Sequence, residues 1–368
     1  MLLPIGGAEN GVFLGSPAYK PLLGDTWVVA ACRVACGEPD AREQWRVMQV
    51  VVVGLGAIGG LFAARLDAAG HRVSALVRET TAEAVRENGL VFTSSEGETS
   101  VHRIDVVTDA LALAPPDLLI LALKAQVLAE EARSLVTLIG PDTLVLPTMN
   151  GVPWWFLGDD WLASVDPHGH IATSLPLAQT VGAVVHLSST SPAPGHCRHV
   201  FGERLILGEP GGGVSARVNA LAEELAMVGF ATETSIDVRR DIWFKLWGNM
   251  TLNPVSALTG SACDAILDDE LVRGFMGAAM AEAAEVGERI GCPVEQSVDE
   301  RIAVTRKLGA FKTSMLQDAE AGRPLEIDAL IGAVHEIARR VGVPTPNIDA
   351  LFGLVRLMAR SRVISTGA

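Results

Sequence analysis

Residues 49–59, QVVVVGLGAIG, decide the fold of this chain. The apolar run at 49–53 has the length of a buried strand, and a helical pattern follows it up to Ala69. The turn between them has the spacing GxGxxG and consists of Gly54, Leu55, Gly56, Ala57, Ile58 and Gly59. Glycines at these positions allow a tight turn, close approach of a pyrophosphate group and close packing of helix on strand. The turn therefore predicts a dinucleotide site at the helix N-terminus, and a purely structural glycine-rich turn is the alternative.

Strands and helices alternate after this turn. A second strand at residues 72–77 completes a βαβ unit. Further strand-like runs are residues 101–107, 117–123, 144–147 and 181–187, and residues 127–138 have a helical pattern. Such alternation is typical of an α/β fold with a mostly parallel sheet. We also expect residues 197–201 and 204–207 to pair as a hairpin that turns at Gly202-Glu203.

Strand patterns disappear after Ile236, and long helical stretches take their place. The sequence thus predicts a Rossmann-like dinucleotide-binding domain at residues 48–236 and an all-helical domain at 237–368. Residues 1–47 fit neither pattern, because proline, glycine and small residues interrupt every run, and Met48 is a candidate natural start. We interpret residues 1–47 as an extension that is either not native or disordered.

The composition excludes several classes of protein. Asp and Glu number 43 against 29 Lys and Arg, and the net charge of −14 argues against a general nucleic-acid or anionic-membrane binder. No run of about 18 uninterrupted apolar residues occurs, so we expect no membrane span. The five cysteines are odd in number and scattered, which fits free thiols in a reducing cytoplasm. No Cys or His pair has convincing spacing for a metal site, so we predict none.

Three side chains at predicted strand ends are candidates for cofactor binding. The second strand ends at Arg78, where an NAD-dependent enzyme usually has Asp or Glu. An arginine can pair with a 2′-phosphate, so Arg78 favours NADPH over NADH. The alternatives are that Glu79 faces the ribose or that Arg78 is only solvated. Lys124 and Asn150 also follow strands, at the sheet edge where open α/β folds bind ligands, although ordinary loop residues stand there too.

A polar stripe lies in the predicted helical domain. Lys245, Asn249 and Asn253 are spaced four residues apart among Trp, Phe, Leu and Met, so they share one helix face. Asparagine is a poor helix former, and two of them on successive turns favour a face that contacts a polar ligand. A polar seam between domains is the alternative. Pro254 should bend or end the helix directly after Asn253.

Two more polar candidates lie in the segment SMLQDAEAGRPLEID, residues 314–328. Glu326 stands in the first turn of a predicted helix, where the helix dipole favours a carboxylate. Ser314 has the pattern of a mid-helix hydroxyl that bonds to its own backbone. The residues alone leave a functional and a structural role open for both.

Together, these segments resemble the ketopantoate reductase (2-dehydropantoate 2-reductase) family. The resemblance covers nearly everything from Met48 onward, and its segments are GLGAIG at 54–59, LALKA around Lys124, Asn150-Gly151, KLWGNMTLNPVSALT at 245–259 and the segment at 314–328. It implies an NADPH-dependent reduction of a 2-oxo acid to a 2-hydroxy acid. The reaction would take place in a cleft between the Rossmann-like domain and a helical domain of the 6-phosphogluconate dehydrogenase C-terminal type. The nominal reaction converts 2-dehydropantoate to pantoate in pantothenate biosynthesis.

The resemblance also implies roles on the substrate side. Lys245 resembles the general acid that protonates the developing alkoxide. Glu326 would hold that lysine charged and oriented. Asn249 and Asn253 resemble the residues that hydrogen-bond substrate oxygens, and Ser314 resembles a donor to the substrate carboxylate.

On the cofactor side, the resemblance implies that Lys124 and Asn150 lie near the nicotinamide and Arg78 near the 2′-phosphate. Asn150 is a candidate for binding both the substrate and the cofactor, and Glu326 is a candidate for binding the cofactor in addition to its role beside Lys245. The chain departs from the family pattern after Asn150-Gly151, where it has the aromatic cluster Trp154-Trp155-Phe156.

The aromatic cluster keeps a second function open, a paralogue that reduces another branched or aromatic 2-oxo acid. A non-catalytic NADP(H)-binding regulator is an alternative from another class. The presence of both Lys245 and Glu326 argues against a regulator, because a sensor needs no proton donor. The sequence is compatible with a monomer and with a homodimer.

Overall fold

The computed structural model describes residues 47–158, 160–307 and 309–366. They belong to one compact unit that begins at Val47. The interpretation of residues 1–47 as an extension falls, except for Val47, outside the described residues.

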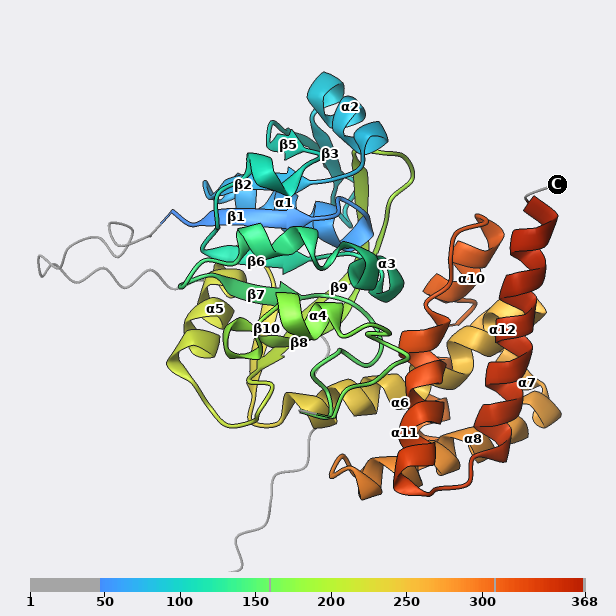
Figure 1. Cartoon of the computed structure of the whole chain (residues 1–368). Coiled ribbons are helices and arrows are strands. Elements are labelled where there is room, and N and C mark those ends of the chain that lie inside the picture. The colour runs from blue at the N-terminus through green and yellow to red at the C-terminus, as the bar shows by residue number, and fades with distance from the viewer. Residues whose placement is uncertain (1–46, 159, 308, 367–368) are drawn as a thin grey trace, which may run out of the picture. The chain divides into compact units, whose positions relative to one another are not determined.

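A five-stranded parallel sheet occupies the first half of this unit (Figure 1). Its strands are β1 (Gln49–Val53), β2 (Arg72–Leu76), β5 (Asp105–Val107), β6 (Leu118–Leu121) and β7 (Leu144–Pro147). Their order is β5-β2-β1-β6-β7, and every neighbouring pair is parallel. Strands β1 and β6 are almost completely buried, which explains their uninterrupted apolar sequences. The predicted α/β fold with a Rossmann-like sheet is confirmed.

A second sheet packs against the helix that follows the glycine-rich turn. Its strands are β3 (Leu90–Thr93), β4 (Thr99–His102), β8 (Gly182–Thr190), β9 (His196–Gly208) and β10 (Ala231–Ser235), in the order β10-β9-β3-β4 with β8 paired to β9. Helix α1 (Ala57–Ala68) contacts both sheets, and its Leu61, Phe62 and Leu66 have no exposed surface. A helix that is apolar all round is buried all round, so α1 is held firmly between the two sheets.

Two strand predictions are wrong in detail. The run at 101–107 forms two strands, because β4 ends at His102 in the second sheet and β5 begins at Asp105 in the first. The hairpin at Gly202-Glu203 does not form, because β9 continues through both residues. Gly202 has a φ of 79°, and the pairing of β9 with β8 shifts register nearby, so the glycine marks a β-bulge. A bulge and a hairpin both use glycine here, and the sequence pattern does not separate them.

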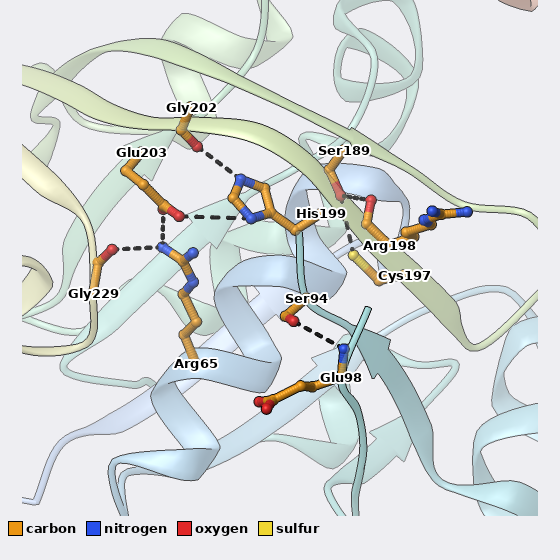
Figure 2. A network of polar contacts seen from close by, with 10 residues as sticks. All are labelled: Arg65, Ser94, Glu98, Ser189, Cys197, Arg198, His199, Gly202, Glu203 and Gly229. Atoms are coloured by element: carbon orange, nitrogen blue, oxygen red, sulfur yellow. Dashed lines mark hydrogen bonds and ion pairs between the residues drawn. The ribbon is translucent and has the colours of Figure 1, made fainter. Parts of the chain in front are cut away.

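A polar network connects this bulge to α1 (Figure 2). Glu203 pairs with Arg65 of α1 and lies 3.6 Å from Nδ1 of the buried His199. The Nε2 atom of His199 lies 2.7 Å from the Gly202 carbonyl oxygen, and Arg65 donates to the Gly229 carbonyl at 2.8 Å. These contacts fix β9 against α1, so the bulge helps to anchor the helix that follows the glycine-rich turn.

Helices dominate the second half of the described chain (Figure 1). They are α6 (Val238–Thr259), α7 (Cys263–Asp268), α8 (Glu270–Arg289), α9 (Val298–Arg306), α10 (Ser314–Glu320), a π-helical turn (Asp328–Gly332), α11 (Ala333–Val341) and α12 (Pro346–Thr366). The other helices of four or more residues are α2 (Glu79–Asn88), α3 (Ala125–Glu131), α4 (His170–Ser174) and α5 (Ala216–Met227), with a 3-10 segment at Ser134–Leu138. The expected helix at 127–138 is therefore split between α3 and the 3-10 segment.

Helix α6 is the central helix of this half and does not end at Pro254. It continues to Thr259, so of the two predicted effects of Pro254, a bend or an end, the end is wrong. Proline removes one backbone hydrogen bond, but the turn around it is packed into the core, where residues 250–257 are all buried. Trp243 and Trp247 are buried on the same helix, and the Trp247 indole donates to the Met280 carbonyl at 2.7 Å. Tertiary packing therefore outweighs the lost hydrogen bond.

Candidate functional site

The glycine-rich turn lies between β1 and α1, as the sequence predicts. Gly54 has a φ of 91°, and a Cβ atom there would lie 2.9 Å from Leu123 Cδ2. A Cβ atom on Gly59 would lie only 1.9 Å from the Gly54 carbonyl oxygen. Both positions therefore need glycine to keep the turn tight.

Gly56 differs from the other two glycines, because a Cβ atom there would meet nothing within 4 Å. It is the N-cap of α1 and provides no side-chain cap, so no side chain satisfies the first N–H groups of the helix there. Open space beside uncapped N–H groups at the positive end of a helix suits a phosphate. The residues of the turn fit a dinucleotide pyrophosphate.

Arg78 and Glu79 follow the strand next to β1. Arg78 is exposed as the N-cap of α2, and its guanidinium forms no ion pair with another described residue. Glu79 pairs with Arg86 at 2.9 Å. The carboxylate is thus engaged within α2, whereas the arginine remains available to a ligand at the carboxyl edge of the sheet.

Lys245 is held by two acceptors from the first half of the unit. Its Nζ donates to Asn150 Oδ1 at 2.8 Å and to the Val185 carbonyl oxygen at 2.7 Å. Burial lowers the pKa of Lys245 to about 8, and the charge of Glu326 opposes this shift. A lysine with a pKa near neutrality can exchange its proton more readily than an exposed one. The two acceptors orient the ammonium group, and Glu326 influences it through charge.

Asn150 reaches Lys245 because its loop lies close to the π-helical turn. The Val152 N–H donates to the Ala329 carbonyl oxygen at 2.8 Å. Gly151 has a φ of 90°, and a Cβ atom there would lie 2.4 Å from the same oxygen. Glycine at this position therefore allows the contact that positions Asn150.

Two members of the polar stripe of α6 line an open cavity together with Asn150. Lys245 and Asn249 are both in its wall. Asn253 is buried one turn farther along α6. Neither Asn249 nor Asn253 forms a side-chain hydrogen bond to another described residue, so both carboxamides remain available for a ligand.

Glu326 and Lys124 belong to a second polar cluster. Lys124 donates to Asp318 Oδ2 at 2.7 Å and to the Pro324 carbonyl oxygen at 2.6 Å. Burial raises the pKa of Glu326 to about 7, opposed by the Lys124 charge and by a hydrogen bond from the Ala125 backbone. The cluster therefore connects the end of β6 to the segment between α10 and the π-helical turn.

Ser314 is the first residue of α10 rather than a mid-helix residue. It is exposed, and the Thr313 side chain caps the helix by accepting from the Leu316 N–H. Helix α10 packs against α6. Among the described residues, Ser314 is not part of the cavity wall that contains Lys245 and Asn249.

The aromatic cluster after Gly151 is buried and borders another cavity. Trp154 and Trp155 line an open pocket, which shares Asn150 and Met149 with the Lys245 cavity. The other lining residues are mostly apolar and include Val165 and Ile171. An apolar chamber therefore adjoins the polar one.

Sequence reasoning missed three participants in these contacts. Val185 acts through its backbone carbonyl, which no side-chain pattern reveals. Asp318 lies within the quoted segment 314–328, and its acidic side chain was the available signal. His186 follows Val185 on β8, and burial together with the Lys245 charge lowers its pKa to about 4.

Two features are absent from the described residues. No described helix has both the length and the apolar character needed to cross a membrane. The described residues also contain no group of three His, Cys, Asp or Glu side chains arranged to hold a metal ion.

Comparison with known proteins places the chain in a family. The family model "Ketopantoate reductase PanE/ApbA" matches residues 50–212, and "Ketopantoate reductase PanE/ApbA C terminal" matches residues 237–359. A 2-dehydropantoate 2-reductase of Mesorhizobium japonicum is 42% identical over 86% of this chain and 99% of its own length.

Solved structures of similar proteins point to the same family and fold. A Ralstonia solanacearum protein assigned to the ketopantoate reductases has a TM-score of 0.83 and 51% identity, over 86% of this chain and 99% of its own. A D-mandelate dehydrogenase solved with NADH and anilino(oxo)acetate shares the fold, with a TM-score of 0.75 and 24% identity over 86% of this chain and 99% of its own. The chain therefore belongs to the ketopantoate reductase family of dinucleotide-dependent oxidoreductases.

Proposed function

We propose that this chain reduces a 2-oxo acid to a 2-hydroxy acid with NADPH, with 2-dehydropantoate as the nominal substrate in pantothenate biosynthesis. The observation that carries the proposal is the Lys245 ammonium, fixed by Asn150 Oδ1 and the Val185 carbonyl in the wall of a polar cavity. The name of the Mesorhizobium relative, 2-dehydropantoate 2-reductase, supports the same reaction.

Lys245 is the proposed proton donor. Because its pKa is about 8, it is mostly protonated at neutral pH and can give its proton to the carbonyl oxygen as that oxygen becomes an alkoxide. Asn150 and the Val185 carbonyl keep Nζ in place for this transfer. Glu326 favours the charged form of the lysine.

The remaining polar groups are proposed to bind the substrate. Asn249 and Asn253 have free carboxamides one turn apart on α6, which suits hydrogen bonds to substrate oxygens. We assign Ser314 to the substrate carboxylate, and its exposed position on α10 requires the substrate to reach that helix.

For the cofactor, we propose the glycine-rich turn, Arg78, Lys124, Asn150 and Glu326. The dinucleotide would supply the hydride when bound. The uncapped N-terminus of α1 at Gly56 would hold the pyrophosphate. Arg78 has no acidic partner among the described residues and would pair with the 2′-phosphate, which favours NADPH over NADH.

We also propose residues 48–236 as the cofactor domain and 237–368 as the substrate domain. A cytoplasmic location and a monomeric or homodimeric state stay predictions from the sequence.

The apolar chamber favours a second candidate substrate. Trp154 and Trp155 line an apolar pocket beside Asn150. A 2-oxo acid with a branched or aromatic side chain could place that side chain against these apolar walls, which would stabilise its complex. This reading keeps the proposed chemistry and changes the substrate.

The test is NADPH oxidation by the purified chain, followed at the nicotinamide absorbance band. 2-Dehydropantoate is tried first, then a panel of 2-oxo acids with side chains of increasing size. A kcat/KM of about 10⁴ M⁻¹s⁻¹ or more with 2-dehydropantoate would support the nominal substrate, and faster turnover of a bulkier acid would support the second candidate. NADPH binding without turnover of any panel member would contradict the proposal and favour a regulator.

A further inference from the structure

Arg301 on α9 is a cation without an acidic partner. Its Nε atom is buried and has no hydrogen-bond partner, and its guanidinium forms no ion pair with another described residue. Burial lowers the pKa of Arg301, and no neighbouring carboxylate offsets that effect. Arg301 as a whole is partly buried, and an unpaired cation there loses part of its hydration without a partner in exchange. The arrangement is understandable if an anion that is not part of the chain completes it.

The guanidinium packs against Phe244 and Gly248 of helix α6. We call the surface formed by these two residues the seat. Its Cζ atom lies 5.0 Å from the centre of the Phe244 ring, within the range of a cation–π contact. A Cβ atom on Gly248 would lie 2.8 Å from Arg301 Nε and 3.0 Å from Nη2. Glycine inside a helix costs about 1 kcal/mol relative to alanine. The glycine at this position makes the room that the guanidinium occupies.

The seat lies beside the polar stripe of α6. Gly248 lies three residues after Lys245 and directly before Asn249, so it borders the polar face of α6. From the opposite side, His186 follows Val185, whose carbonyl accepts from Lys245. Burial and the charges of Lys245, Arg204 and Arg301 lower the pKa of His186, and the charge of Glu233 opposes them. Lys245 and Arg301 are thus both close enough to His186 for their charges to act on its imidazole.

We propose that Arg301 binds a carboxylate of the substrate, an inference that rests on the proposed reduction of a 2-oxo acid. A guanidinium presents two parallel N–H groups that match the two oxygens of a carboxylate. Bound there, the acid would be anchored beside Lys245, and Phe244 and Gly248 would keep the guanidinium in place. The carboxylate next to the keto carbon and a second, terminal carboxylate share this chemistry.

The first test compares Arg301→Gln with the unchanged protein on three substrates. These are the best monocarboxylic 2-oxo acid of the panel, its primary amide and a 2-oxo diacid. Loss of a charge-assisted hydrogen-bond pair should raise KM for the acid about 10- to 100-fold and leave KM for NADPH unchanged. The unchanged protein should prefer the acid over the amide, and Arg301→Gln should lose this preference if the carboxylate beside the keto carbon is bound.

If Arg301 binds a terminal carboxylate instead, the variant should lose only the preference for the diacid over the monoacid. The proposal is overturned if Arg301→Gln keeps both preferences, or if it weakens the acid and the amide equally. Arg306→Gln is the matched control on the same helix, because Arg306 is exposed and already paired with Asp268 at 2.6 Å. This control should leave both preferences intact.

A second variant tests the seat without removing the charge. Gly248→Ala would push the guanidinium away, so it should raise KM for the acid more than for the amide. Gly274→Ala on α8 is its control, because a Cβ atom there would meet nothing within 4 Å. Equal effects of Gly248→Ala on acid and amide would contradict the proposed seat.

A binding measurement separates this inference from the proposed reaction. Calorimetric titration of the NADP⁺-saturated protein with the 2-hydroxy acid and with its amide needs no turnover. If Arg301→Gln binds the hydroxy acid more weakly than the unchanged protein does but binds the amide equally well, the carboxylate site is supported. This holds even if no 2-oxo acid is reduced. Normal reduction together with unchanged acid binding by Arg301→Gln would overturn the assignment of Arg301 and leave the proposed function standing.

Discussion

The glycine-rich turn and the Lys245 cavity are built in opposite ways. The turn consists of adjacent residues, and its important groups are backbone atoms and missing side chains at Gly54, Gly56 and Gly59. The cavity combines side chains and one carbonyl from a loop after β7, from β8 and from α6. A site made of backbone tolerates changes in distant segments, whereas a site made of converging side chains depends on each segment separately.

The largest expected effect belongs to the cavity. Lys245→Ala removes the proposed proton donor and should lower kcat about 10²- to 10⁴-fold, the usual contribution of a positioned acid. NADPH affinity should stay the same, because the glycine-rich turn is not touched. Single-turnover kinetics and a fluorescence titration with NADPH check both parts. Unchanged turnover would remove Lys245 from the mechanism, and a parallel loss of NADPH binding would show that the two regions are not independent.

Two alanine substitutions separate the structural role of the glycine-rich turn from its proposed role in NADPH binding. Gly59→Ala places a methyl group against the Gly54 carbonyl, so it should lower the free energy of unfolding by about 1–3 kcal/mol and also weaken NADPH binding. Gly56→Ala meets no neighbour and should change stability by less than about 0.5 kcal/mol. It should nevertheless weaken NADPH binding about 10- to 100-fold, because the methyl group would occupy the space proposed for the pyrophosphate.

Thermal melting and NADPH titration of both variants distinguish a structural turn from a binding turn. Normal NADPH affinity of Gly56→Ala would contradict the proposed position of the pyrophosphate. Equal loss of stability in both variants would contradict the open space at Gly56.

The pH dependence tests the charge coupling inside the cavity. Lys245 must carry a proton to act as donor, so kcat/KM for reduction should fall about tenfold per pH unit above a pKa of about 8. The negative charge of Glu326 raises the pKa of Lys245. Glu326→Gln removes that charge, so the alkaline limb should move to lower pH. An unchanged limb, or one that moves to higher pH, would contradict the coupling between the two residues.

The same contrast explains what the sequence could predict. The residues from Gly54 to Gly59 are contiguous, so their spacing was enough to predict the turn and the sheet that supports it. The stripe Lys245, Asn249 and Asn253 was visible because helix periodicity places it on one face. The partners of this stripe come from segments far away in the sequence, so the Val185 carbonyl could not be predicted from side-chain pattern. The continuation of α6 through Pro254 was missed for a related reason, because packing from distant segments decides it.

The smallest expected effect concerns the Lys124–Asp318 contact, which joins the end of β6 to α10. Both side chains are partly exposed, 28% for Lys124 and 14% for Asp318, so solvent screens the pair and Asp318→Asn should lower the free energy of unfolding by about 1 kcal/mol or less. The Asp318 charge also raises the pKa of Glu326, so its removal should lower that pKa. Protonation of Glu326 below its pKa of about 7 removes the charge that favours protonated Lys245, so kcat/KM should fall on the acid side as Glu326 is protonated. In Asp318→Asn that acid-side fall should move to lower pH, while the Lys245 limb stays near pH 8. Arg323→Gln is the matched control, since it removes the more exposed partner of the same carboxylate. Urea unfolding and a pH profile of kcat/KM are measured for both variants. A change in stability alone would show that the contact only holds α10 in place, whereas a shifted pH profile of Asp318→Asn would show that it also adjusts the charge of Glu326.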